Sequence, residues 1–92
     1  MAVLDAANLT FDIKDTACQD LYSVIYQGTW DGATVTALTS NDGINYVAIE
    51  DTDSLVDTTF NMLVAFAFLR FQISGGGGSQ SINLHVKRIA KN

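Results

Sequence analysis

The chain has 92 residues, of which 48% are hydrophobic and 16% are charged. This composition is sufficient for one domain with a hydrophobic core, and it excludes a disordered tail. The formal net charge of −5 argues against a nucleic-acid-binding module, because contacts to phosphate need clustered Lys and Arg.

Apolar and polar residues alternate in short stretches along the chain. Residues 1–7 fit an N-terminal arm, a first strand or a single helical turn, and the pattern does not separate these three. Alternation from Leu9 to Ile89 then predicts half-buried strands whose alternate side chains share one interior. The predicted strands cover residues 9–14, 21–27, 33–40, 46–50, 58–62, 68–74 and 81–89.

Two Asp-Gly pairs mark the turns around the predicted strand 33–40. They are Asp31-Gly32 and Asp42-Gly43, and Asp-Gly supplies the positive φ that tight turns require. Thr and Val between them suit a pleated, half-buried surface. The acidic run 51–57 is predicted to be a loop or a short edge segment.

The segment after residue 62 is the hardest to assign. Met62–Leu69 is an apolar run dense in helix formers, but Leu69, Phe71 and Ile73 then alternate with polar residues. We expect a central strand over 68–74, with residues 63–67 either crossing between the two strands or continuing the strand before them.

A glycine-rich stretch, Gly75–Ser79, lies between the last two predicted strands. It matches a common engineered linker, but its flanks are two well-patterned strands. We therefore interpret it as a flexible hairpin loop. Because glycine loses the most backbone entropy on folding, this loop should be mobile unless a neighbour holds it.

These elements predict an all-β fold: a single small antiparallel β-sandwich of jelly-roll or galactose-binding-like type. Turn signals at intervals of about 8 to 12 residues predict about seven to eight strands within one domain, 1–92. The chain has no proline, so its edge strands lack one common protection against pairing with another chain.

Charge is divided unevenly along the chain. Residues 1–57 hold all ten acids and one base, for a net −9, whereas residues 58–92 hold four bases, for +4. Either the basic C-terminal strands pair with acidic N-terminal strands inside one fold, or oppositely charged surfaces meet between molecules.

Catalytic and metal-binding patterns are weak. A carboxylate pair drawn from Asp42, Glu50 and Asp57 would need an enclosed groove, for which a sandwich of this size leaves little room. We expect no enzymatic activity and no cofactor. Asp51 and Asp53, with Asp57, have spacing suitable for calcium but lack the EF-hand glycine and terminal Glu, and a solvated acidic loop is the alternative.

Cysteine and hydropathy patterns exclude further classes. A lone Cys18 cannot form an internal disulfide, and with His85 far away in sequence it gives no metal-ligand spacing. Met62–Leu69 is far shorter than the ~20 residues that span a bilayer. The N-terminus has no signal-peptide pattern, so we expect a protein made in a host cytoplasm, with no membrane or nucleic-acid partner.

Aromatic and polar residues near the Asp-Gly turns are candidate binding residues. They are Trp30, Asp31, Asn41, Asp42 and Tyr46, placed together at one loop end. Trp30 is either a ring for stacking on a sugar or a cap on the open end of the hydrophobic core. The candidate interface residues are Arg70, His85, Lys87 and Arg88.

Several short motifs over residues 25–89 resemble small virion proteins of tailed bacteriophages with a discoidin or galactose-binding-like sandwich. The matching motifs are the Gly28-Thr-Trp-Asp-Gly-Ala turn, the Ser40-Asn-Asp-Gly-Ile-Asn-Tyr hairpin, Leu69-Arg-Phe-Gln-Ile-Ser-Gly and the final Ser81-Ile-Asn-Leu-His-Val strand. Residues 62–69 depart from the pattern, because a Pro-x-Gly loop is usual there.

This resemblance implies a capsid decoration (cement) protein on the virion surface. Its partners would be the major coat protein, across joints between coat subunits, and copies of itself. Two alternatives stay open: a carbohydrate- or receptor-binding module of a phage tail or fibre, with a glycan as ligand, and a self-assembling neck or tail component.

Overall fold

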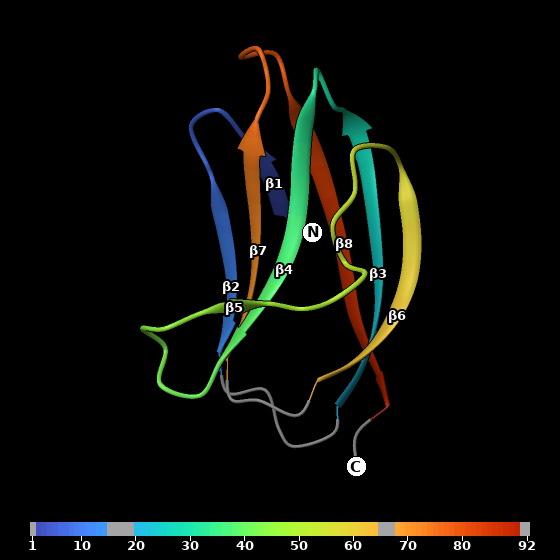
Figure 1. The fold of residues 1–92 in the computed structure, drawn as a ribbon. Helices are drawn as coiled ribbons and strands as arrows, with labels where there is room; N and C mark the ends of the chain where they lie inside the picture. Colours follow the sequence, from blue (N-terminus) through green and yellow to red (C-terminus); the bar gives the residue numbers. More distant parts are fainter. Residues whose placement is uncertain (1, 15–19, 65–67, 91–92) are drawn as a thin grey trace.

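The computed structural model describes residues 2–14, 20–64 and 68–90, and these form eight β-strands with no helix among them (Figure 1). No described segment is a helix long and apolar enough to cross a membrane. The strands are β1 (Ala2–Asp5), β2 (Thr10–Lys14), β3 (Asp20–Thr29), β4 (Ala33–Ser40), β5 (Val47–Ala48), β6 (Thr58–Val64), β7 (Phe68–Gly75) and β8 (Ser81–Ala90).

The strands form two four-stranded antiparallel sheets packed face to face, as predicted. Sheet A has the order β1-β8-β3-β6 and sheet B the order β2-β7-β4-β5. The first four strands pair with the last four in reverse, β1 with β8, β2 with β7, β3 with β6 and β4 with β5. This rolled-up hairpin is the jelly-roll arrangement.

The core lies between the sheets and is built from alternate residues of the long strands. On β7, Leu69, Phe71 and Ile73 are buried while Gln72 between them is exposed, so residues 68–74 do form a central strand. The period of two thus gave the inward face correctly. The buried apolar residues are Leu4, Tyr22, Val24, Tyr26, Ala33, Val35, Ala37, Met62, Leu69, Phe71, Ile73, Ile82 and Leu84.

The start of the predicted alternation is wrong about burial. Leu9 is 53% exposed. Leu9 follows a turn that the Asp5 carboxylate holds by accepting hydrogen bonds from the amides of Ala7 and Asn8. Its carbonyl still accepts the Ile73 amide of β7 at 2.9 Å, so the backbone remains next to the sheet while the side chain lies exposed at the end of the edge strand β2.

Three segment assignments are resolved by the structure. Residues 2–5 form the first strand, and residues 58–64 continue as one strand, β6. The strand predicted over 46–50 is limited to Val47–Ala48, because the chain turns away at Asp51, whose φ is +60°. Residues 65–67 and Cys18 lie outside the described residues.

Candidate binding surface

Trp30 closes one end of the sandwich. Its half-buried ring packs against the core and meets Tyr26 edge-on, with ring centroids 6.4 Å apart. Its indole N–H donates to the Asp57 carboxylate at 2.8 Å, and the Gly28 amide donates to the same oxygen. These two hydrogen bonds lower the pKa of Asp57. Trp30 is therefore a core cap, with its one polar atom already engaged.

Asp31, in the β3–β4 turn, holds the glycine-rich loop. Its carboxylate accepts hydrogen bonds from the backbone amides of Gly77 and Ser79, both at 3.1 Å. The Gln80 side chain adds a contact to the Gly78 amide at 2.7 Å. Asp31 is thus the neighbour that holds the glycine-rich loop, and its carboxylate orders the loop backbone.

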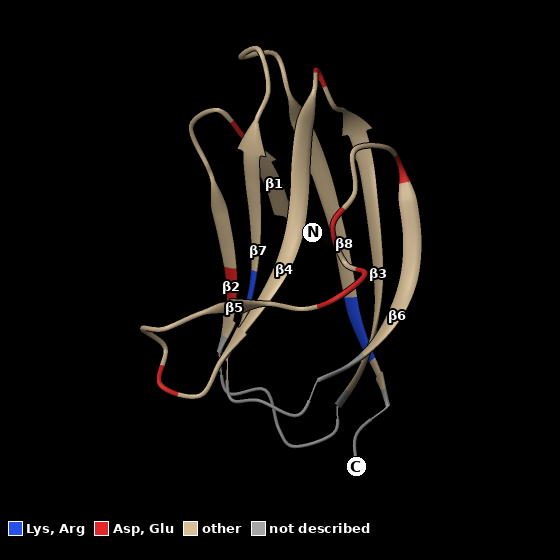
Figure 2. Cartoon of the chain, in the orientation of Figure 1, with Lys and Arg blue, Asp and Glu red and all other residues tan. Residues whose placement is uncertain are grey.

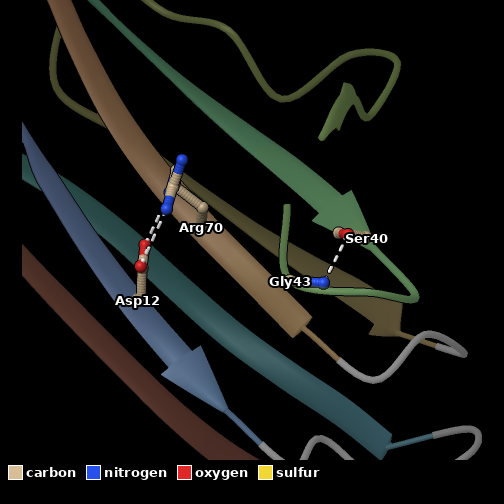
Figure 3. Close-up of polar contacts among 4 residues, drawn as sticks. All are labelled: Asp12, Ser40, Gly43 and Arg70. Carbon is tan, nitrogen blue, oxygen red and sulfur yellow. Dashed lines mark hydrogen bonds and ion pairs between the residues drawn. The ribbon is translucent and has the colours of Figure 1, made fainter. Parts of the chain in front are cut away.

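The turn after β4 is organised around Asp42. One oxygen of its carboxylate accepts hydrogen bonds from the Ser40 hydroxyl and from the amides of Ile44 and Asn45, each at 2.8 Å. The Ser40 hydroxyl oxygen in turn accepts the Gly43 amide at 3.0 Å (Figure 3). Such nested side-chain turns give a loop a defined shape.

These contacts make the loop sensitive to acid. The Asn45 and Ile44 amides hold the pKa of Asp42 well below its ordinary value. A depressed pKa in the folded state stabilises the fold above the unfolded pKa of about 3.9, and the stabilisation is lost as pH falls through the folded pKa. We expect the free energy of unfolding to decrease below about pH 4, because the unfolded chain then binds a proton at Asp42 whereas the folded chain keeps this carboxylate ionised.

The variant Asp42→Asn isolates this effect. It should be less stable than wild type at neutral pH, and the difference should shrink as pH falls. Urea unfolding between pH 2.5 and 7 measures both curves, with Glu50→Gln as the control for loss of one exposed negative charge. A difference that is constant with pH would contradict the role given to the Asp42 carboxylate.

The structure does not bring the five predicted binding residues together. Trp30 and Asp31 lie before β4, whereas Asn41, Asp42 and Tyr46 follow it. An eight-residue strand spans roughly 25 Å, so the two groups are at opposite ends of the sandwich (Figure 1). A single loop-end site that uses all five residues is not formed.

Tyr46 instead lies on the outer face of sheet B. Its ring covers the Arg70 guanidinium, with 4.0 Å from the carbon Cζ to the ring centroid. Arg70 also makes a two-pronged ion pair with Asp12 on the neighbouring strand, at 2.7 and 3.0 Å (Figure 3). The hydrogen bond to Asp12 raises the pKa of Arg70. A base from the C-terminal part of the chain is here paired with an acid from the N-terminal part inside one sheet.

The four predicted interface residues also separate. Arg70 is on β7, whereas His85 and Lys87 point outward from β8 on the opposite sheet, and Arg88 lies opposite Tyr22 in the β3–β8 register. Figure 2 shows Lys and Arg on β7 and β8, while most acidic residues lie on loops. His85 and Lys87 border an open hollow of about 430 Å³ whose other lining includes Ile25.

The most exposed apolar side chains gather on the long segment between β4 and β6. This segment, residues 41–57, is called the crossing segment because it includes β5, passes beside β4 and then crosses over to the start of β6 on the other sheet (Figure 1). Ile44 is 80% exposed, Val47 68%, Val56 66% and Leu55 56%. Half of the eight exposed large hydrophobic residues in the described chain are therefore on it.

Buried polar contacts anchor the crossing segment to the core. The Thr52 hydroxyl donates to the Ile49 carbonyl at 2.7 Å, and the Thr52 carbonyl accepts the Tyr26 hydroxyl at 3.0 Å. Ser54 and Val35 exchange two backbone hydrogen bonds, at 2.9 and 3.0 Å. The exposed apolar side chains are thus carried on an anchored backbone, as in preformed binding loops.

A second feature of this region is an open hollow of about 380 Å³ beside the Asp42 turn. It is lined by Thr39, Ser40, Asn41, Asp42, Asn45 and Val47. Hydroxyl and amide groups lie there next to an apolar side chain, so the hollow combines polar groups with an apolar surface, as ligand pockets do.

Acidic residues of the crossing segment do not converge on a metal site. Among residues 2–14, 20–64 and 68–90, no three His, Cys, Asp or Glu side chains are grouped as metal ligands would be. Asp57 faces Trp30 and Gly28 instead.

The fold and surface define a small jelly-roll sandwich with an anchored, apolar crossing segment. No protein-family model, curated protein or solved structure matches this chain significantly.

Proposed function

We propose that this protein is a non-enzymatic structural component of a virion, a decoration protein that binds the capsid surface across joints between coat subunits. The crossing segment is the part that contacts the shell. The observation that carries the proposal is the outward display of Ile44, Val47, Leu55 and Val56 on an anchored backbone.

Exposed apolar side chains on an ordered loop favour a protein partner. Each large side chain gains roughly 1.5–3 kcal/mol when fully buried, so the covered state is preferred when a complementary surface is present. An anchored loop also loses little conformational entropy on binding. Ile44 and Val47 lie before and at the start of β5, and Leu55 and Val56 lie after it, so the segment offers contacts at two points, as a protein bridging two subunits needs.

The fold and the sequence motifs support the same class. Jelly rolls are common in viral capsid and lectin domains, although a fold by itself does not assign a function. The turn and strand motifs that resemble phage virion proteins, from Gly28 to Val86, all lie within the jelly roll. The coat protein is the expected partner, and the capsid surface the expected location.

Binding to coat shells tests the proposal. Shells assembled without this chain, from the genome that encodes it, are mixed with the purified protein and imaged by cryo-electron microscopy. We expect density at symmetry-related joints of the shell. The double variant Ile44→Ser, Val47→Ser should lower the affinity about tenfold or more, since about 1.4 kcal/mol is a factor of ten.

Leu9→Ser is the matched control, because Leu9 is also exposed but lies outside the crossing segment. It should bind like wild type. Shells without added density at saturating protein would overturn the proposal that the protein binds the capsid. Binding by the double variant equal to that of wild type would overturn the proposal that the crossing segment makes the contact.

A glycan-binding role is the second candidate, and the hollow beside the Asp42 turn is the observation that favours it. Its test is a glycan array with the variant Asn41→Ala, which removes a lining amide outside the Asp42 hydrogen bonds given above. Loss of a specific glycan signal on Asn41→Ala would support this candidate. Trp30→Ala is unsuitable as a test, because Trp30 packs against the core.

A further inference from the structure

The two sheets have four edge strands, and three of them carry features that prevent pairing with another chain. β1 has four residues and β5 has two, so neither offers a long row of free backbone groups. β2 has charged residues at Asp12 and Lys14. Short edge strands and edge charges are the usual protections of natural sheets.

The fourth edge, β6, has none of these protections. Its seven residues, Thr-Thr-Phe-Asn-Met-Leu-Val, include no charge and no proline. Among the described strands β6 pairs only with β3. Figure 1 shows it at the rim of the molecule, and Figure 2 shows it uncharged after the acidic residue at its start. Alternate N–H and C=O groups along β6 therefore face outward without a strand partner in the described chain.

The side chains of β6 suit pairing with an identical strand. An antiparallel pair centred on Asn61 places Phe60 opposite Met62 of the second copy, and both residues are on the core side of sheet A. Phe60 is only half-buried within one molecule, so the contact would extend the core across the junction. Asn61 meets its own copy on the outer face, where two amides can hydrogen-bond.

Charge also favours a second copy at this edge. Each chain carries −5, but the paired span 58–64 contributes nothing to that repulsion, and Asp57 lies just outside it. An acidic or basic strand would oppose its own copy directly across the axis, whereas this one does not.

We propose that β6 is a self-association edge, through which two copies join by antiparallel β6–β6 pairing into one continuous eight-stranded sheet about a two-fold axis. The inference does not depend on the capsid proposal, because it concerns the purified chain alone.

Sedimentation velocity over protein concentrations up to about 1 mM covers the affinity range of small interfaces. We expect a monomer–dimer equilibrium for the wild type. Asn61→Lys should weaken dimerisation at least tenfold, because two ammonium groups then meet at the axis. Gln72→Lys adds the same charge at an exposed position of the central strand β7, and it should dimerise like wild type.

Two outcomes overturn the inference: a wild type that stays monomeric throughout, or an Asn61→Lys dimer as stable as that of Gln72→Lys. In the second case any weakening of the dimer would report only the change in net charge.

Disulfide trapping gives a second test that does not rely on the lysine variant folding. In a Cys18→Ser background, Asn61→Cys should form a disulfide-linked dimer under mild oxidation, because residue 61 meets its own copy within about 5.5 Å between Cβ atoms. Thr59→Cys should not, since its copy is about 13 Å away in this register. Equal trapping of the two variants, or trapping of Thr59→Cys alone, contradicts the proposed pairing.

Discussion

Replacement of Gly28 by alanine is expected to destabilise the fold by about 3 kcal/mol or more. A Cβ at this position would lie 2.1 Å from the backbone carbonyl oxygen of Ser81 on β8. Gly28 pairs with Ile82 in the β3–β8 ladder, so the added methyl group would meet the backbone of a neighbouring central strand. The two strands cannot move apart there without breaking their hydrogen bonds, and the clash therefore cannot be relieved at low cost.

Gly32→Ala is the matched control. Gly32 also has positive φ, +78°, but a Cβ there meets nothing within 4 Å. Its expected cost is only the backbone strain of about 1–2 kcal/mol. Urea unfolding of both variants measures the difference. If Gly28→Ala is no less stable than Gly32→Ala, the close approach of β3 and β8 at Ser81 is not as the structure describes it.

Local sequence patterns were sufficient to predict most of the strands and the fold class. The period of two located the long strands, and on β8 it correctly placed Ile82 and Leu84 in the core. It was less informative where the ladder ends. Leu9 lies just after a turn at the end of the edge strand β2, and β5 keeps only two residues because Asp51 adopts a left-handed conformation. Such endings depend on side-chain contacts that alternation does not report.

The candidate sites were harder to predict because their partners are distant in sequence. The Asp12–Arg70 pair joins residues 58 apart, and the Trp30–Asp57 hydrogen bond joins residues 27 apart. Neither Asp12 nor Asp57 carries a local signal for its partner, so these contacts needed the sheet register.

One error in the site was avoidable from the sequence. An eight-residue strand between the two Asp-Gly turns spans roughly 25 Å, so Trp30 and Asp42 could not share one loop end. The strand length, already predicted as residues 33–40, contained that information. The exposed apolar side chains of the crossing segment were not foreseen, because their residue types alone do not distinguish a core position from a surface position.

The Tyr26 hydroxyl links the core to the crossing segment, and its removal should loosen that segment. Tyr26 is fully buried, with Phe60 and Phe71 packed edge-on against its ring at centroid distances of 5.3 and 6.1 Å. Burial, with a smaller effect of the Asp53 charge, raises the pKa of the phenol, so it remains a donor. It donates to the Thr52 carbonyl at 3.0 Å.

Tyr26→Phe keeps the ring packing but leaves the buried Thr52 carbonyl without this donor. We expect a loss of about 1–3 kcal/mol in the free energy of unfolding. Hydrogen exchange should also speed up at the Ile49 and Ser54 amides, which hydrogen-bond to β4. The segment that we propose as the contact surface would then lose its preformed shape, and affinity for its partner would fall because ordering is added to the cost of binding.

Tyr46→Phe is the control, because Tyr46 lies on the outer face of sheet B and contacts Arg70 through its ring. Its stability should stay within about 0.5 kcal/mol of wild type. Unfolding in urea and amide exchange measured by mass spectrometry separate the two variants. If Tyr26→Phe leaves both stability and the exchange of residues 49–54 unchanged, the crossing segment is held by Ser54 and the other backbone contacts rather than by Tyr26, and its order does not depend on the core.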